Sequence, residues 1–190
     1  MANFVFRQAK FGILADQDHS ATLGLDFHAD TFAIAFVTEA LTEATHAAVD
    51  NLQALFTEAT GNLTASTGTY TGSGKEYTTS GTYTRAGTAM DIASEAVYES
   101  TTGGTSSFAY LTAANKTVAS LGAANGTPIV GLVLYRKEGG GDPTDDGLNI
   151  PVSYHDFAVQ PDGQDCLVQW DAVNGAGTLA TAGGVVLKIV

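Results

Sequence analysis

Residues 23–38 read LGLDFHADTFAIAFVT and carry the clearest strand signal in the chain. Large apolar residues recur there at every second position, as they do along a half-buried strand: Leu23, Leu25 and Phe27, then Phe32, Ile34 and Phe36. The intervening Ala33 and Ala35 form a face of small residues. Another layer or another subunit could approach such a face closely.

Other segments of strand length follow, and turn residues separate them. They cover residues 96–100, 106–113, 128–137, 150–159, 165–170 and 184–190. The nearly continuous apolar run at 128–137 is typical of a buried central strand. Asp162-Gly163 is a hairpin signal between 150–159 and 165–170. Strands at this spacing predict a mainly β fold, an antiparallel β-sandwich or a barrel-like fold.

One short α-helix is expected at residues 41–58, where apolar residues recur with a period near 3.6. Thr42 is its expected N-cap, and Gly61 is its expected stop. We expect a single domain over residues 1–190. Its N-terminal segment, residues 1–15, is either a short helix or an extended arm that docks on a neighbour.

Residues 60–88 form a tract rich in Gly, Ser, Thr and Tyr. Thr and Tyr favour strands, and glycines allow tight turns. The tract therefore predicts an exposed hairpin or a long loop with recurring tyrosines that pack on something: Tyr70, Tyr77 and Tyr83. Its GSGKEY segment at 72–77 is not a phosphate loop, because Thr69 and Glu76 stand where that motif needs Gly and Ser or Thr.

Charge limits the classes of partner. The chain has 20 acidic and 8 basic residues, which gives a formal charge of −12. Nucleic-acid binding and attachment to anionic membranes both need clustered Lys and Arg, so both are disfavoured. No apolar run approaches the ~18 residues of a membrane-spanning helix, and no secretory signal pattern occurs. Cys166, the one cysteine, is expected to be a buried thiol.

Candidate catalytic and metal-binding groups are few. The loop Asp142–Asp146 holds three aspartates that could bind calcium, but the EF-hand spacing is not met. His46 and Asp50 are four residues apart on the expected helix and could form a hydrogen bond. His155 and Asp156 would face opposite sides of a strand. Because no zinc, Ser-His or other catalytic signature occurs, we expect no enzyme activity, no metal site and no cofactor.

Several short motifs follow one another in a recognisable order. In chain order they are Leu25-Asp26, Asp30-Thr31, the strand at 34–37, Thr45-His46 with Asp50, the Tyr/Thr/Gly-rich stretch at 69–84, the strand at 131–137, Pro161-Asp162-Gly163 and the segment at 167–171. This order resembles a family of small structural proteins of tailed bacteriophages that are found near the major capsid protein. The chain is longer than the family pattern, with extra residues around 85–125 and at 172–183.

The resemblance implies a function in the virion. Members of the family look like capsid decoration (cement) proteins, which bridge subunits of the major capsid protein on the capsid surface. It implies synthesis in the host bacterial cytoplasm and a homo-oligomer, with a trimer as the expectation. A tail or head-tail joining protein is the alternative in the same setting. A carbohydrate- or calcium-binding β module for host attachment is the alternative from another class.

Apolar arms and Tyr-rich loops suit contacts between subunits. The expected interface residues are Phe4, Phe6 and Phe11 of the arm and Tyr70, Tyr77 and Tyr83 of the loop. Packing of these residues on the chain's own core is the alternative. Trp170 alternates with Val168 and is expected in the core. On the interface interpretation, removal of residues 1–12 should weaken attachment to the capsid without unfolding the domain.

Overall fold

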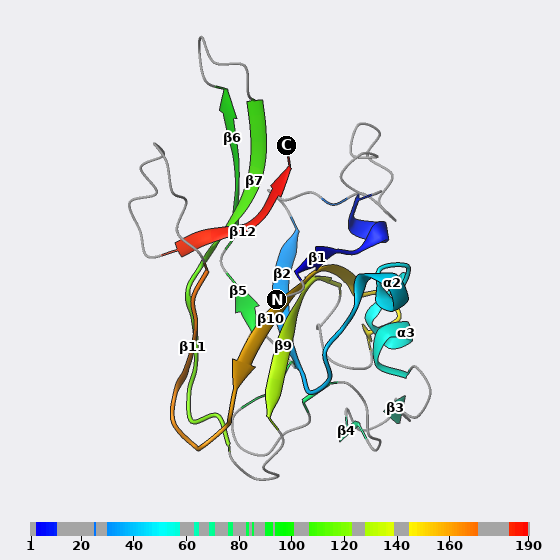
Figure 1. Ribbon diagram of the computed structural model, residues 1–190, viewed down its shortest axis with the longest axis vertical. Helices are drawn as coiled ribbons and strands as arrows, with labels where there is room; N and C mark the ends of the chain where they lie inside the picture. Colours follow the sequence, from blue (N-terminus) through cyan, green and yellow to red (C-terminus); the bar gives the residue numbers. More distant parts are fainter. Residues whose placement is uncertain are drawn as a thin grey trace.

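The chain was analysed as a computed structural model, which has a five-stranded sheet at its centre (Figure 1). The structure describes residues 3–10, 25, 30–57, 63–64, 69–70, 76–77, 83, 85, 90–92, 94–100, 107–122, 128–138, 145–170 and 183–189. In spatial order the strands of the central sheet are β1 (Phe4–Val5), β10 (Ile150–Val159), β9 (Ile129–Lys137), β2 (Thr31–Val37) and β5 (Asp91–Ile92). All four pairings are antiparallel.

Three smaller antiparallel sheets complete the described strands. One pairs β8 (Lys116–Val118) with β11 (Cys166–Val168), and one pairs β3 (Leu63–Thr64) with β4 (Thr69–Tyr70). The third has the order β12 (Gly183–Ile189), β7 (Ser107–Ala114) and β6 (Ser94–Ser100). The expectation of a mainly β, antiparallel, sandwich-like fold is confirmed.

Both faces of β2 are buried, and the chain itself supplies the layer over the small-residue face. Ala33, Ala35 and Val37 belong to a core on the side of the helices α2 (Glu43–His46) and α3 (Leu52–Thr57). Helix α3 contributes Leu52, Leu55 and Phe56 to this core, and the segment before α2 contributes Leu41. The large-residue face of β2 lies in a second core with Val118, Val168 and Trp170 from the β8–β11 side. The central sheet therefore separates two cores.

A bulge in β10 changes which of its side chains face each core. Pro151 pairs with Tyr135 and Ser153 with Leu134, so Val152 is an extra residue in the ladder. Val152 lies in the core on the β8–β11 side, and Tyr154 lies in the helix-side core. Without the extra residue, positions 152 and 154 would share a face, because side chains alternate along a strand.

The expected helix at 41–58 is two short helices, so the expectation of one continuous helix was wrong. Thr42 is the N-cap of α2, but its side chain makes no capping hydrogen bond. Asn51 begins α3, where its Oδ1 accepts a hydrogen bond from the Ala54 backbone N–H at 2.8 Å. Because an Asn side chain that caps a new helix competes with continuation of the old one, the chain turns between α2 and α3.

The prediction that the strands at 150–159 and 165–170 pair with each other as a hairpin was also wrong. The turn is present, with Gly163 at φ +84° and the Gln164 N–H donating to the Asp162 carboxylate at 2.9 Å. However, β11 pairs with β8, and Leu121 exchanges backbone hydrogen bonds with the turn. The turn therefore passes the chain from the central sheet to the second layer.

The N-terminal segment packs on its own chain. β1 pairs with the edge of β10, and the Phe6 N–H donates to the Val152 carbonyl at 3.0 Å. Phe4 is buried, and Phe6 is 0% exposed. Phe4 and Phe6 therefore pack on the chain's own core, which was the alternative to their prediction as interface residues, and we now expect removal of residues 1–12 to destabilise the fold. The cause is the open edge of β10, which gains backbone hydrogen bonds and apolar burial from β1.

Gly131 tests the packing of the helix-side core. A Cβ atom at Gly131 would lie 2.6 Å from Oη and 2.7 Å from Cζ of Tyr154, whose ring is fully buried. We expect Gly131→Ala to lower the free energy of unfolding by ~1–3 kcal/mol, because a packed core has no room for it. Urea denaturation measures the change. Gly147→Ala is the control, because its Cβ would meet only the flexible Gln53 side chain, at 3.1 Å. Equal stability of both variants would contradict the packing.

Candidate functional site

A buried ionic cluster joins three distant parts of the chain. The Arg85 side chain is 1% exposed and lies between the carboxylates of Glu76 and Asp146. Its Nη1 and Nη2 donate to Asp146 at 2.7 and 2.8 Å, and its Nε and Nη2 donate to Glu76 at 2.5 and 3.1 Å. We call these three residues the Arg85 clasp. Paired, bidentate hydrogen bonds of this kind are the condition for burying a guanidinium.

Aromatic rings and hydrogen bonds enclose the clasp. The guanidinium carbon lies 5.5 Å from the ring centre of Phe56 and 5.6 Å from that of Tyr135. The Tyr83 hydroxyl donates to Glu76 at 3.0 Å and accepts from the Phe36 N–H at 3.2 Å. Since Tyr83 belongs to one core and Phe56 and Tyr135 to the other, the clasp ties the two cores together.

The charges of the clasp are not balanced, because one guanidinium faces two carboxylates. Burial, and to a lesser degree the charge of Asp146, raise the pKa of Glu76 well above its ordinary 4.5, while the Tyr83 hydroxyl opposes the shift. Burial also raises the pKa of Tyr83 and brings that of Tyr135 to about 12. Both phenols therefore stay protonated near neutral pH, and Tyr83 remains a hydrogen-bond donor to Glu76.

The clasp changes the interpretation of two sequence motifs. Asp146 is buried with both carboxylate oxygens bound to Arg85, so it does not form the solvated turn or calcium ligand that the Asp142–Asp146 loop suggested. No cluster of three potential metal-ligating side chains occurs in the part of the chain that the structure describes. Asp142 lies outside that part, and so do residues 72–75 of the GSGKEY segment, whose Glu76 is in the clasp.

The loop tyrosines lie mostly in the core. Tyr77 and Tyr83 are buried, and their rings meet edge to face with centres 5.6 Å apart. Both rings pack in the chain's own core, which contradicts the prediction of Tyr77 and Tyr83 as interface residues. Within the tract at 60–88, β3 pairs with β4, and this pairing includes the backbone of Tyr70. Phe11 lies outside the described residues.

The histidines have structural neighbours. The spacing allowed a His46–Asp50 hydrogen bond, and the structure shows the Thr42 N–H donating to His46 Nδ1 at 3.0 Å. Ser153 Oγ lies 2.9 Å from His155 Nε2, but Ser153 is 2% exposed, so a substrate cannot reach the hydroxyl. His19 and His28 lie outside the described residues.

His155 and Asp156 lie on opposite faces of β10, as expected for adjacent residues of a strand. The His155 ring meets the Trp170 ring edge to face, with centres 5.5 Å apart. Asp156, on the other face, accepts a hydrogen bond from the Tyr154 hydroxyl at 2.9 Å. Trp170 and Cys166 are buried, as the sequence predicted, and burial raises the pKa of the Cys166 thiol.

The sheet of β6, β7 and β12 is the part of the molecule that reaches away from the central sheet. Figure 1 shows the β6–β7 hairpin extending past the end of β12 and away from β9 and β10. Among the described residues, two connections join it to the body: β5 leads towards β6, and β7 leads through Asn115 into β8. We call this three-stranded unit the projecting sheet. The contacts of these connections with the body therefore bear on the orientation of the projecting sheet.

Hydrogen bonds and one ion pair hold both connections against the body, and we call these contacts the footing. On the β5 side, Lys137 Nζ lies 2.6 and 2.8 Å from the carboxylate oxygens of Asp91. Lys116 Nζ donates to the Asp91 carbonyl at 2.9 Å and so links the two connections. On the β7 side, Trp170 Nε1 donates to the carbonyl of Ala114 at 3.2 Å. The projecting sheet is therefore anchored to the body at its base.

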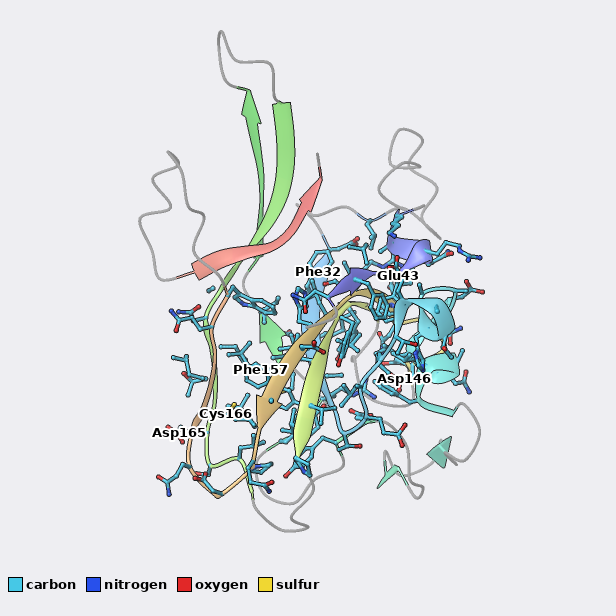
Figure 2. The ribbon with its side chains drawn as sticks, viewed as in Figure 1. Phe32, Glu43, Asp146, Phe157, Asp165 and Cys166 are labelled. Carbon is cyan, nitrogen blue, oxygen red and sulfur yellow. The ribbon has the colours of Figure 1, made fainter. Side chains whose placement is uncertain are left out.

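Figure 2 places the labelled Asp146 on the side of α2 and α3, and Asp165 and Cys166 on the opposite side of the view. The clasp and the footing share no residue. Sequence reasoning missed both, because Asp91 and Lys137 are 46 residues apart, Arg85 and Asp146 are 61 residues apart, and no local pattern marks such partners.

Comparison with known proteins assigns no family to the chain. The chain matches no protein-family model, no curated protein and no solved structure. Among the described residues, no helix is long and apolar enough to cross a membrane.

Removal of the clasp's cation should strongly destabilise the fold. Arg85→Met leaves two buried carboxylates facing each other, so we expect the free energy of unfolding to fall by ~3–5 kcal/mol. Chemical denaturation measures it. Lys10→Met is the matched control, because the Lys10–Glu43 ion pair is 55% and 62% exposed and should contribute little. Similar losses in both variants would show that the clasp contributes no more than a surface pair.

Loosening the footing should affect the projecting sheet before the body. Trp170→Phe keeps a buried ring but loses the Nε1–H donor to Ala114, which is worth ~1 kcal/mol. We expect amide hydrogen exchange in β6 and β7 to rise roughly fivefold, with β9 and β10 unchanged. Leu167→Ala, at a residue 53% exposed on β11, is the control. A uniform rise over all strands would contradict a local role for the footing.

Proposed function

We propose that this chain is a structural protein of a tailed-phage virion that decorates the capsid and cements it by bridging subunits of the major capsid protein. The observation that carries the proposal is the projecting sheet, which stands on a footing of hydrogen bonds and an ion pair. A body with two cores and a buried clasp supports that footing. The resemblance of the motif order to phage structural proteins gives the setting.

A protein that bridges subunits needs reach and stiffness more than reactive groups. Binding that occurs only on the assembled shell adds to the stability of that shell by mass action. A stiff projection loses little conformational entropy when it docks, so more of its contact energy appears as affinity. The footing through Asp91, Lys116 and Trp170 supplies this stiffness.

The burial of Phe4, Phe6, Tyr77 and Tyr83 moves the proposed contact surface. These aromatic residues stabilise the body, so the contacts with the capsid protein fall to the projecting sheet. The formal charge of −12 suits this role, because it keeps free copies soluble and gives an outer surface that does not attract DNA.

Shells that lack this chain provide the test. We expect the purified chain to bind such shells to saturation at hundreds of copies per particle, to raise their melting temperature, and to give density at local symmetry axes in cryo-electron microscopy. The Leu167→Ala variant should bind as the unaltered chain does. Density confined to the tail or its joint would favour a tail or head-tail joining protein. Absence of density from the whole particle would favour the carbohydrate- or calcium-binding module.

A further inference from the structure

One edge of β2 has a strand partner only near its start. Among the described strands, β5 pairs with Phe32 and Ala33 of β2, and the Ile34 N–H donates to the Met90 carbonyl at 3.2 Å. An edge strand with unpaired backbone groups is open to pairing with other chains. The backbone at Phe36, further along this edge, therefore takes its partners from outside the strands.

The residues around the clasp supply those partners. Glu76 forms an isolated β-bridge with Val37, and the Tyr77 N–H donates to the Phe36 carbonyl at 2.8 Å. The Phe36 N–H donates to the Tyr83 hydroxyl at 3.2 Å, and the two rings stack with centres 5.4 Å apart. We call these contacts the edge cover. Because Tyr83 also donates to Glu76, the clasp and the edge cover are one connected network.

The two carboxylates of the clasp share a single donor nitrogen. Arg85 Nη2 donates to Glu76 Oε2 at 3.1 Å and to Asp146 Oδ2 at 2.8 Å, so these two oxygens are close neighbours. The Glu76 and Asp146 side chains are 2% and 1% exposed. Two ionised carboxylates that share a buried site repel each other, and one guanidinium balances the charge of only one of them. A proton on one carboxylate removes the excess charge.

The surroundings of Glu76 favour that proton. The titratable and charged groups that face Glu76 from the described elements are Arg85, Asp146, Tyr83 and Tyr135. Burial raises the pKa of Glu76, the charge of Asp146 raises it further, and the Tyr83 hydroxyl opposes the shift. The Arg85 guanidinium is divided between both carboxylates, and both phenols are neutral. Glu76 is therefore the carboxylate that takes up the proton.

We propose that the clasp is a pH switch on the edge of β2, in which Glu76 holds a proton while the edge cover is closed and loses it when the cover opens. With Glu76 protonated, the clasp contains one buried anion and one buried cation. When Glu76 gives its proton to water, a second buried negative charge develops beside Asp146. Water solvates that charge better than the core does, so ionised Glu76 favours release of Tyr77 from Phe36. The switch does not depend on the proposed function.

The direction of the switch follows from the raised pKa. The folded chain binds the Glu76 proton more tightly than the unfolded chain, in which the carboxyl has its ordinary pKa of 4.5. The stabilisation by this proton is complete below the ordinary pKa and is lost as the pH rises through the raised pKa. Between these two values, each pH unit increases the opening constant about tenfold. Carboxylates with a lowered pKa, which cause acid denaturation, have the opposite effect.

Titration of the full, unaltered chain tests the proton on Glu76. In protein labelled with ¹³C-glutamate, the shift of the Glu76 Cδ resonance, assigned by through-bond correlation, reports its ionisation. We expect a midpoint at least about one pH unit above the ordinary 4.5. A midpoint at or below 4.5 would overturn the switch. This measurement needs no variant and so does not depend on the folding of one.

Amide hydrogen exchange tests the effect on the edge. We expect the protection factors of the Phe36 and Tyr77 amides, which correct for the intrinsic pH dependence of exchange, to fall up to about tenfold per pH unit above about pH 4.5. Glu76→Gln has no proton to lose and should remove this fall. Glu43→Gln makes the same change at a side chain 62% exposed and should retain it.

Two results of the exchange experiment would overturn the switch. One is constant protection of Phe36 and Tyr77 in the unaltered chain over the pH range of the titration. The other is a fall with pH that persists in Glu76→Gln. Neither measurement involves a capsid shell, so the switch and the proposed function stand or fail separately.

Discussion

The pairing of Arg85 with Glu76 and Asp146 is the constraint on which the described body most depends. A guanidinium that is 1% exposed costs the fold much stability unless acceptors meet its donors, and these acceptors come from residues 9 and 61 positions away in the chain. Through Asp146, the clasp also holds the turn before β10, whose Asp146 carbonyl accepts from Gln53 at the start of α3. One buried cation thus sets the positions of the tract, the turn and a helix together.

The two faces of the central sheet explain why such a clasp is needed. Small residues on one face of β2 let the helices come close, and large residues on the other face fill the space under the β8–β11 layer. Apolar packing of this kind is strong but not directional. Arg85 lies between Tyr83 of one core and Tyr135 of the other. Its directional hydrogen bonds fix how the two cores are placed relative to each other, which apolar contacts alone do not.

Local patterns in the sequence predicted the elements better than their partners. The strand at 150–159 matches β10 residue for residue, and the alternation in 31–38 marked β2 with both of its faces. The hairpin after β10 was wrong, and the pairing of the N-terminal segment was not foreseen, because pairing depends on distant strands, here β8 and the β10 edge. Arg85 and Asp91 were missed for the same reason, since an ion pair leaves no periodic trace in the sequence.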